Sequence, residues 1–199
     1  TITNAPTQSM EVGMDYPNKK SGSALGDLLS TNAGSVSVWA KADTLNTEGF
    51  LINTAGFKLN YVGPNLQAVY NGLTPLAITS ATAGVWYHVA LTWDDSTSNM
   101  TFYVNGSLIG SANDAVLSPM STWGITVGGL NFVDDMSQLA QQFDGKLYDL
   151  QLYDHTLDST AVSNLYINPG SPELEVSDAV LANRYLFDGD GDDAAGGVH

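Results

Sequence analysis

The sequence predicts an all-β protein, built as an antiparallel sandwich or barrel with one short helix. Short runs of β-branched and aromatic residues recur along the chain, and Gly, Asn, Asp and Pro separate them about every ten residues. A helical pattern, in contrast, occurs convincingly once. With 199 residues, of which 43% are hydrophobic, the chain can bury the core of one large sandwich. We therefore expect residues 1–199 to form a single domain.

Eight segments have the length and the alternating character of strands. They are Ser35–Lys41, Phe50–Thr54, Phe57–Val62, Leu66–Tyr70, Trp86–Trp93, Met100–Val104, Gly124–Gly129 and Lys146–Tyr153. The last alternates most regularly. Its odd-numbered residues from Leu147 to Gln151 are predicted on one face, and its even-numbered residues from Tyr148 to Leu152 on the other.

One turn and one helix are defined by local signals. Asn105-Gly106 follows Met100–Val104, and because this dipeptide readily takes positive φ it predicts a two-residue hairpin turn. Asp158 can cap a helix that carries apolar residues through Tyr166 and ends before Asn168-Pro169.

The C-terminal region changes character twice. Pro169–Asp178 is acidic and interrupted by proline and glycine, which predicts a linker. Ala179–Phe187 again has the composition of a strand, and the chain then becomes acidic and glycine-rich up to His199. We expect residues 179–199 to supply a strand and an acidic loop that complete this sandwich or a neighbouring one.

The composition excludes some partners. With 21 acidic and 6 basic residues the formal charge is −15, so nucleic acid and anionic membranes would be repelled. No stretch approaches the roughly 18 to 20 apolar residues that span a bilayer. Cysteine is absent, which leaves the redox compartment open. The scarcity of Lys and Arg is typical of an extracellular, cell-surface or virion-surface protein, and a salt-adapted cytoplasmic protein is the alternative.

Three segments resemble the laminin G-like domains of the concanavalin A-like lectin and glucanase superfamily. Val85–Gly110 is similar to the family's signature strand pair, Phe143–Tyr166 to its final strand and following helix, and Ser35–Asp43 to an early core strand. The resemblance implies an antiparallel jelly-roll β-sandwich. It says little about activity, because this superfamily contains lectins, adhesion modules, virion proteins and glycan-cleaving enzymes.

The order of the segments departs from that family. Arg184–His199 resembles the opening segment of such domains, yet it stands at the C-terminus. Three readings remain open: a circular permutation within a monomer, exchange of the strand with a neighbouring copy, and a unit cut from a tandem array. In an exchanged assembly, apolar side chains of the last strand would hold the copies together. These assembly residues are Val180, Tyr185, Leu186 and Phe187.

The acidic C-terminal loop is the candidate metal site. Its carboxylates alternate with glycines, so that a loop could wrap oxygen atoms around a hard cation, and calcium fits this chemistry. A solvated acidic turn is the alternative. The predicted ligands are Asp188, Asp190, Asp192 and Asp193. The resemblance adds weight to calcium, since laminin G-like domains often hold it.

Candidate ligand-binding residues lie elsewhere. Asp134 and Asp135 fall in a loop that often meets ligands in the resembled family. Trp123 and Tyr70 could stack on sugars if they are exposed, although such aromatic residues more often pack in a core. His88 lies inside a predicted strand, and the resemblance implies a packing histidine that forms local hydrogen bonds.

The sequence predicts that the protein is not an enzyme. Glycoside hydrolysis needs paired carboxylates, and the one close pair of glutamates, Glu173 and Glu175, falls in the predicted linker. We therefore expect a non-catalytic extracellular or virion-surface structural and adhesive module. It would contact copies of itself or other surface proteins, and it could assemble by exchanging its C-terminal strand. The alternative is a calcium-dependent glycan-binding, lectin-like module.

Overall fold

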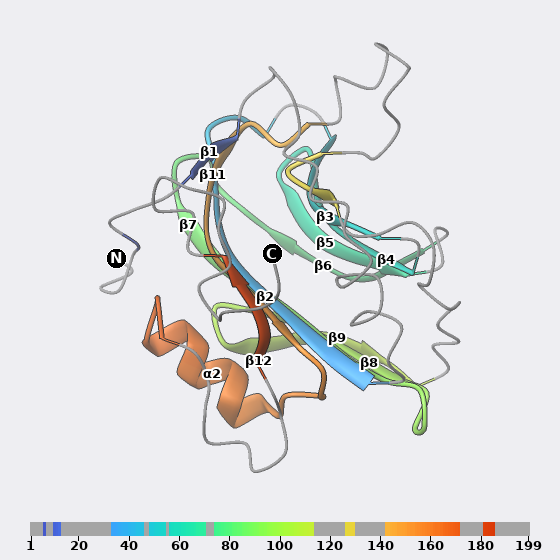
Figure 1. Cartoon of the computed structure of the whole chain (residues 1–199). Coiled ribbons are helices and arrows are strands. Elements are labelled where there is room, and N and C mark those ends of the chain that lie inside the picture. Colours follow the sequence, from blue (N-terminus) through green and yellow to red (C-terminus); the bar gives the residue numbers. More distant parts are fainter. Residues whose placement is uncertain are drawn as a thin grey trace.

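The computed structural model describes residues 6, 10–12, 33–45, 48–54, 56–70, 74–113, 126–129, 142–171 and 181–185 (Figure 1). Two antiparallel sheets face each other, and a helix lies against the outer side of the larger one. The predicted all-β jelly-roll sandwich with one short helix is therefore confirmed for this part of the chain.

The larger sheet has the strand order β1-β11-β2-β7-β8-β9, and β12 also pairs with β11. Its strands are β1 (Met10–Val12), β2 (Ala33–Ala42), β7 (Trp86–Asp94), β8 (Asn99–Val104), β9 (Ser107–Ala112), β11 (Gly145–Tyr153) and β12 (Leu181–Tyr185). All of its pairings are antiparallel.

The smaller sheet has the order β10-β3-β4-β5-β6 and is also antiparallel. Its strands are β3 (Glu48–Asn53), β4 (Phe57–Val62), β5 (Asn65–Tyr70), β6 (Thr74–Ser80) and β10 (Thr126–Val127). Strand β6 was not predicted from the sequence, because Pro75 interrupts a run that otherwise has the composition of a strand.

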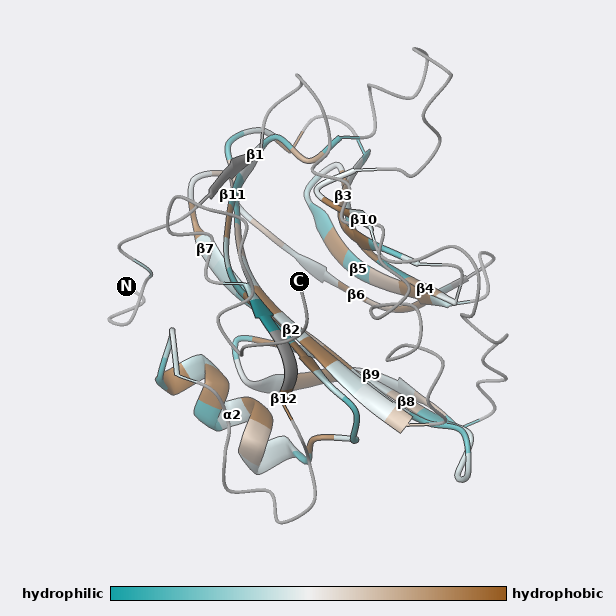
Figure 2. Cartoon of the chain, in the orientation of Figure 1, coloured by the Kyte–Doolittle hydropathy of each residue, from teal (hydrophilic) through white to brown (hydrophobic). Residues whose placement is uncertain are grey.

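The main core lies between the two sheets. Val38, Leu91 and Phe102 of the larger sheet and Leu59 and Leu66 of the smaller one are fully buried there. Figure 2 shows the expected alternation, with hydrophobic bands separated by pale or hydrophilic ones along β5. Burial of large apolar side chains, each contributing about 1.5 to 3 kcal/mol, is the main stabilising term for this packing.

The predicted helix and turn are both confirmed. Helix α2 (Ser159–Ile167) starts after Asp158, whose side chain accepts a 2.8 Å hydrogen bond from the backbone N–H of Ala161. The helix buries Val162 and Leu165 in a second cluster on the outer side of the larger sheet. The β8–β9 turn has φ of 52° at Asn105 and 73° at Gly106, as a two-residue turn of this type requires.

The predicted faces of β11 are wrong. Leu147 lies in the main core together with Leu150 and Leu152, rather than beside Asp149. The cause is a β-bulge opposite β2 between Tyr148 and Gln151, where Asp149 takes φ of 52°. A bulge inserts one residue and reverses the alternation beyond it. Asp is among the few residues that tolerate this backbone conformation.

Candidate functional site

The outer face of the smaller sheet carries a group of polar side chains, beside apolar ones such as Phe50 and Val69. Leu59 and Leu66 point into the core, so their neighbours Asn60 and Gln67 point away from it, and these two are paired across β4 and β5. Lys58 lies on the same outer side, opposite Asn53, which is in turn paired with Thr126 of β10. We call this surface the polar face. It comprises Glu48, Asn53, Lys58, Asn60, Gln67 and Thr126.

Side-chain contacts hold part of the polar face in place. The Asn60 amide donates a 2.8 Å hydrogen bond from Nδ2 to Oε1 of Glu48. The Lys58 ammonium lies 5.4 Å from the centre of the Phe50 ring, which is within cation–π range. The bond to Glu48 also fixes which way the Asn60 amide points, so its Oδ1 is a free acceptor.

Three buried polar atoms of the polar face have no hydrogen-bond partner among the described residues. They are Oδ1 of Asn53, Oδ1 of Asn60 and Oγ1 of Thr126. Leaving such an atom unsatisfied costs about 1 to 3 kcal/mol, so native proteins usually give it a water molecule or a ligand. Their gathering on adjacent strands makes the polar face the candidate binding site.

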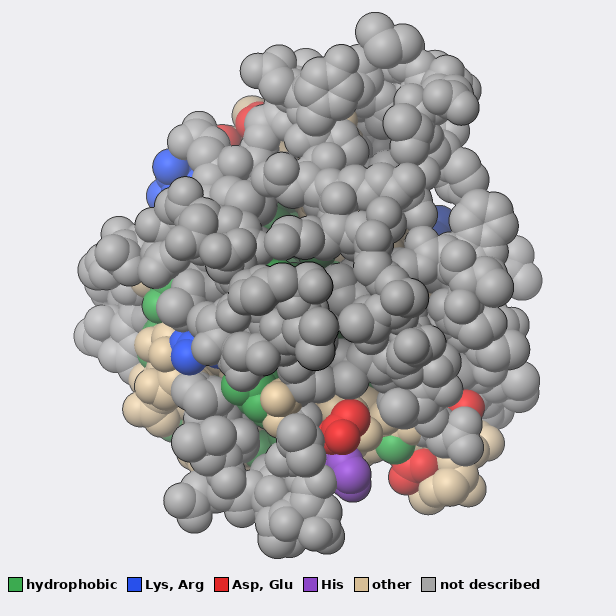
Figure 3. Space-filling view, viewed as in Figure 1, with side chains coloured by type: hydrophobic (Ala, Val, Ile, Leu, Met, Phe, Trp, Pro, Cys, Tyr) green, Lys and Arg blue, Asp and Glu red, His purple; other side chains and the backbone are tan. Residues whose placement is uncertain are grey.

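The exposed fraction of the side chains on the outer face of the smaller sheet rises toward β6. Asn53, Asn60 and Thr126 are buried and Lys58 is half-buried, whereas Ile78, the neighbour of Gln67 on β6, is 51% exposed. On the side of the molecule seen in Figure 3, the described Lys and Arg side chains form no continuous basic patch. The polar face itself carries one basic and one acidic side chain, Lys58 and Glu48, beside its hydrogen-bonding atoms.

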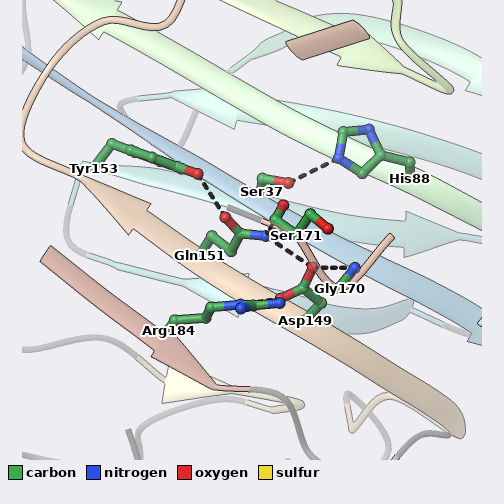
Figure 4. Close-up of polar contacts among 8 residues, drawn as sticks. All are labelled: Ser37, His88, Asp149, Gln151, Tyr153, Gly170, Ser171 and Arg184. Carbon is green, nitrogen blue, oxygen red and sulfur yellow. Dashed lines mark hydrogen bonds and ion pairs between the residues drawn. The ribbon is translucent and has the colours of Figure 1, made fainter. Parts of the chain in front are cut away.

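A second polar cluster joins β11, β12 and the end of α2 (Figure 4). The buried Asp149 carboxylate accepts three hydrogen bonds: from Nε2 of Gln151 (2.8 Å), from the backbone N–H of Gly170 (2.9 Å) and from Nε of Arg184 (2.7 Å). Gln151 also donates to the carbonyl of Ser171 at 3.3 Å. We call these five residues the strand clasp, because they fix β12 to the sheet.

Glycine is required within the strand clasp. Gly170 has φ of +80°, and a Cβ there would lie 2.4 Å from the Tyr148 hydroxyl oxygen. In the predicted linker Pro169–Asp178, Gly170 and Ser171 are therefore held against β11, and residues 172–178 lie outside the described residues.

His88 is a structural residue, as the family resemblance implied. Its Nε2 lies 2.8 Å from Oγ of Ser37, and both residues are almost completely buried. Burial lowers the pKa of His88 to about 3, so the ring is neutral at physiological pH. Although a serine and a histidine are paired here, no carboxylate among the described residues is bonded to Nδ1 of His88, as a catalytic triad would require.

The structure describes few of the predicted site residues. Tyr70 is half-buried and packs against the main core, so its use as a sugar platform stays a prediction. Tyr185 is buried in the same core. The others lie outside the described residues: Trp123, Asp134, Asp135, Val180, Leu186, Phe187, Asp188, Asp190, Asp192 and Asp193.

Calcium binding therefore stays a prediction. Within the described ranges, no group of three or more His, Asp or Glu residues is arranged to hold a metal ion. The four aspartates on which the prediction rests are not among those residues.

Sequence reasoning missed the polar face. Its one signal was the alternation in β4 and β5, which gives Asn60 and Gln67 the side opposite the core. The sequence could not tell that these residues, with Asn53 and Thr126, would be buried rather than solvated.

Comparison with known proteins agrees with the fold. A family model described as the concanavalin A-like lectin/glucanases superfamily matches residues 18–163, which is more than half of the chain. A search of curated proteins gave no match.

Several solved structures are similar. A Bacteroides ovatus protein to which carbohydrate binding is ascribed has a TM-score of 0.65 at 19% identity, over 83% of this chain and 50% of that one. The chain thus spans half the length of that protein. The CBM40 of the Ruminococcus gnavus IT-sialidase, bound to α2,3 sialyllactose, has a TM-score of 0.59 at 16% identity, over 80% and 96% of the two chains. A heptameric SAP-like pentraxin from Limulus polyphemus has a TM-score of 0.56 at 22% identity, over 68% and 70%.

Proposed function

Since the chain belongs to the concanavalin A-like lectin/glucanases superfamily, we propose that it is a non-catalytic, extracellular module that binds a glycan on the polar face. The observation that carries this proposal is the group of unpartnered buried atoms on Asn53, Asn60 and Thr126. Two of the three similar structures described above are named for carbohydrate binding or are bound to a sugar, which supports the same class of ligand.

The atoms of the polar face suit a neutral glycan. The two amide oxygens accept hydrogen bonds, and sugar hydroxyls can donate them, while the Thr126 hydroxyl and the Lys58 ammonium can donate in return. A ligand rich in carboxylate or sulfate groups would place hydrogen-bond acceptors opposite the two amide oxygens, which are also acceptors. Its negative charge would in addition be repelled by Glu48 and by the formal charge of −15 of the chain. An uncharged, hydroxyl-rich chain is therefore the preferred ligand.

The carboxylates argue for binding without cleavage. Glu48 is the acidic residue of the five strands in the smaller sheet, and Asn60 is bonded to it. Glycosidases of the common kind need two carboxyl groups about 5 to 10 Å apart, one on each side of the scissile bond. A single, amide-bonded carboxylate on the polar face does not meet that requirement.

The extracellular location rests on composition and on the type of relative. Lys and Arg are scarce, the surface polarity comes from Ser, Thr, Asn and Gly, and carbohydrate-binding modules commonly act outside the cell. Separately, no helix in the described residues is long and apolar enough to cross a membrane.

The test is glycan binding by the full chain. A glycan array, followed by calorimetry with the best neutral glycan, should show saturable binding. Thr126→Val keeps the shape of the side chain and removes the hydroxyl, so the affinity should fall about two- to tenfold, corresponding to about 0.5 to 1.5 kcal/mol for one hydrogen bond. Its stability should not fall, because an unpartnered polar atom is removed.

The matched control is Thr101→Val, at a half-buried threonine on β8 of the other sheet. It should leave the affinity unchanged. Absence of binding to any glycan, or equal affinity of the wild-type and Thr126→Val proteins, would count against the polar face as the site. Turnover of a bound polysaccharide would refute the non-catalytic assignment.

A further inference from the structure

Two ends of the chain share one edge of β11. β1 pairs with its first part, where Met10 lies opposite Leu147 and Val12 opposite Gly145. β12 pairs with its second part, where Leu181 lies opposite Tyr153 and Tyr185 opposite Leu150. Both run antiparallel to β11 and follow one another along it (Figure 1). The edge of the larger sheet is thus built from a segment near each terminus.

β12 fills two sites on the rest of the molecule. On the inner side, Tyr185 is buried in the main core. On the outer side, Leu181 packs against the cluster that contains α2, and Arg184 reaches Asp149. The strand therefore supplies both apolar contacts and a charge, rather than backbone pairing alone.

Asp149, which pairs with the charge of Arg184, lies on β11 and not on β12. Asp149 and the two residues that donate to it from outside β12, Gln151 and Gly170, are already in place without that strand, and the Asp149 side chain is 3% exposed. A carboxylate buried to this degree needs a cationic partner. Arg184 is the sole arginine among the 199 residues. An apolar strand of another origin could fill the slot, but it would leave the charge of Asp149 uncompensated.

We propose that the edge of β11 accepts β12 from a second copy of this chain as well as from its own, so that copies assemble by exchanging this strand. Every contact of the clasp is the same in either arrangement, since the two copies are identical. Which copy supplies the strand then depends on how the concentration of other copies compares with the effective concentration of the chain's own strand. Residues 172–180 join Ser171 to Leu181, and a segment of this length extends at most about 35 Å.

Such a tether makes the chain's own strand available at an effective concentration of about a millimolar. Exchange should therefore prevail when the copies fold together at comparable concentration, as on a crowded surface. This inference does not depend on glycan binding, and its test does not involve a glycan.

The test uses single-cysteine variants, which is straightforward because the chain has no cysteine. Leu152 and Asn183 are partners across β11 and β12, at a Cα separation that suits a disulfide in antiparallel pairs. A chain with Leu152→Cys and a chain with Asn183→Cys are mixed, unfolded in urea, refolded at high concentration and oxidised. A disulfide that joins the two variants reports exchange directly.

Three controls make the result decisive. Leu152→Cys mixed with Ser80→Cys, an exposed position on β6, gives the background of random collision. Adding Arg184→Leu to the Asn183→Cys chain tests recognition by the clasp. One chain carrying both Leu152→Cys and Asn183→Cys should form the internal disulfide, which shows that the variants fold and that the pair can be bridged.

We expect the Leu152–Asn183 product at least tenfold above the collision background, and a loss of most of it with Arg184→Leu. Formation of the internal disulfide without a mixed product above background would overturn the proposal. Light scattering on the wild-type chain, refolded at increasing concentration, gives an independent readout: dimers or larger species support exchange, and a monomer throughout refutes it.

Discussion

Protonation of His88 should destabilise this protein as the pH falls. The ring packs against both Trp39 and Tyr166, at centroid distances of 5.4 and 6.2 Å, and Nε2 contacts Ser37. No water reaches it, because the residue is 0% exposed. A charged imidazole would have to be desolvated at this site, and this is why burial lowers the pKa of His88 from 6.5 to about 3.

The size and the sign of the effect follow from that shift. Between pH 6.5 and about 3 the unfolded chain binds a proton at His88 and the folded chain does not, so acid favours unfolding. The contribution to stability is complete above pH 6.5 and is lost progressively below it. At about pH 5 the loss is about 1.5 pH units times 1.36 kcal/mol, or about 2 kcal/mol.

Urea unfolding followed by tryptophan fluorescence measures this directly. The wild-type chain and His88→Phe, which keeps a ring but does not titrate, are compared at about pH 7.5 and pH 5. The remaining titratable groups are the same in both proteins, so the difference in how their stabilities change with pH isolates the contribution of His88. The wild type should lose about 2 kcal/mol more than the variant. Equal slopes would refute the burial argument.

Two further predictions concern the C-terminal region. Arg184→Leu removes the cationic partner of the buried Asp149 and should lower the free energy of unfolding, measured in urea, by about 3 to 5 kcal/mol. Adding Asp149→Asn should restore part of this loss. A double variant whose loss equals the sum of the two single losses would contradict the pairing. Calcium at about 100 times its dissociation constant should stabilise the full chain by about 2.7 kcal/mol and raise its Tm by several degrees. Replacing the four predicted aspartate ligands by asparagine should abolish that rise in Tm. An unchanged Tm with calcium would exclude the site.

The sequence was most informative where local chemistry decides the structure. The turn at Asn105-Gly106 and the helix cap at Asp158 depend on backbone conformations and hydrogen bonds that a few adjacent residues specify, and both are confirmed. His88 differs, because its partners Ser37 and Trp39 lie on β2, and the family resemblance rather than local chemistry predicted its packed position.

Features that depend on pairing between distant strands could not be predicted. The bulge at Asp149 arises opposite β2, more than a hundred residues away in the chain, and it reverses the faces that simple alternation predicts for β11. The polar face likewise needs three strands in register before Asn53, Asn60 and Thr126 come together. Composition showed that these residues are polar, but only the sheet shows that they are buried beside one another.

The shared edge of β11 also determines how tension on the chain would enter the fold. Met10 is the end of β1 nearer the N-terminus, and Tyr185 is the end of β12 nearer the C-terminus. Both residues lie near the middle of that edge, opposite Leu147 and Leu150. A pull on both termini would peel the two strands from there in opposite directions, one residue pair at a time. Arg184 is next to the end at which β12 would start to peel. Its ion pair with Asp149 is therefore loaded directly after the Tyr185–Leu150 pair, and it resists the peeling of β12 from an early stage.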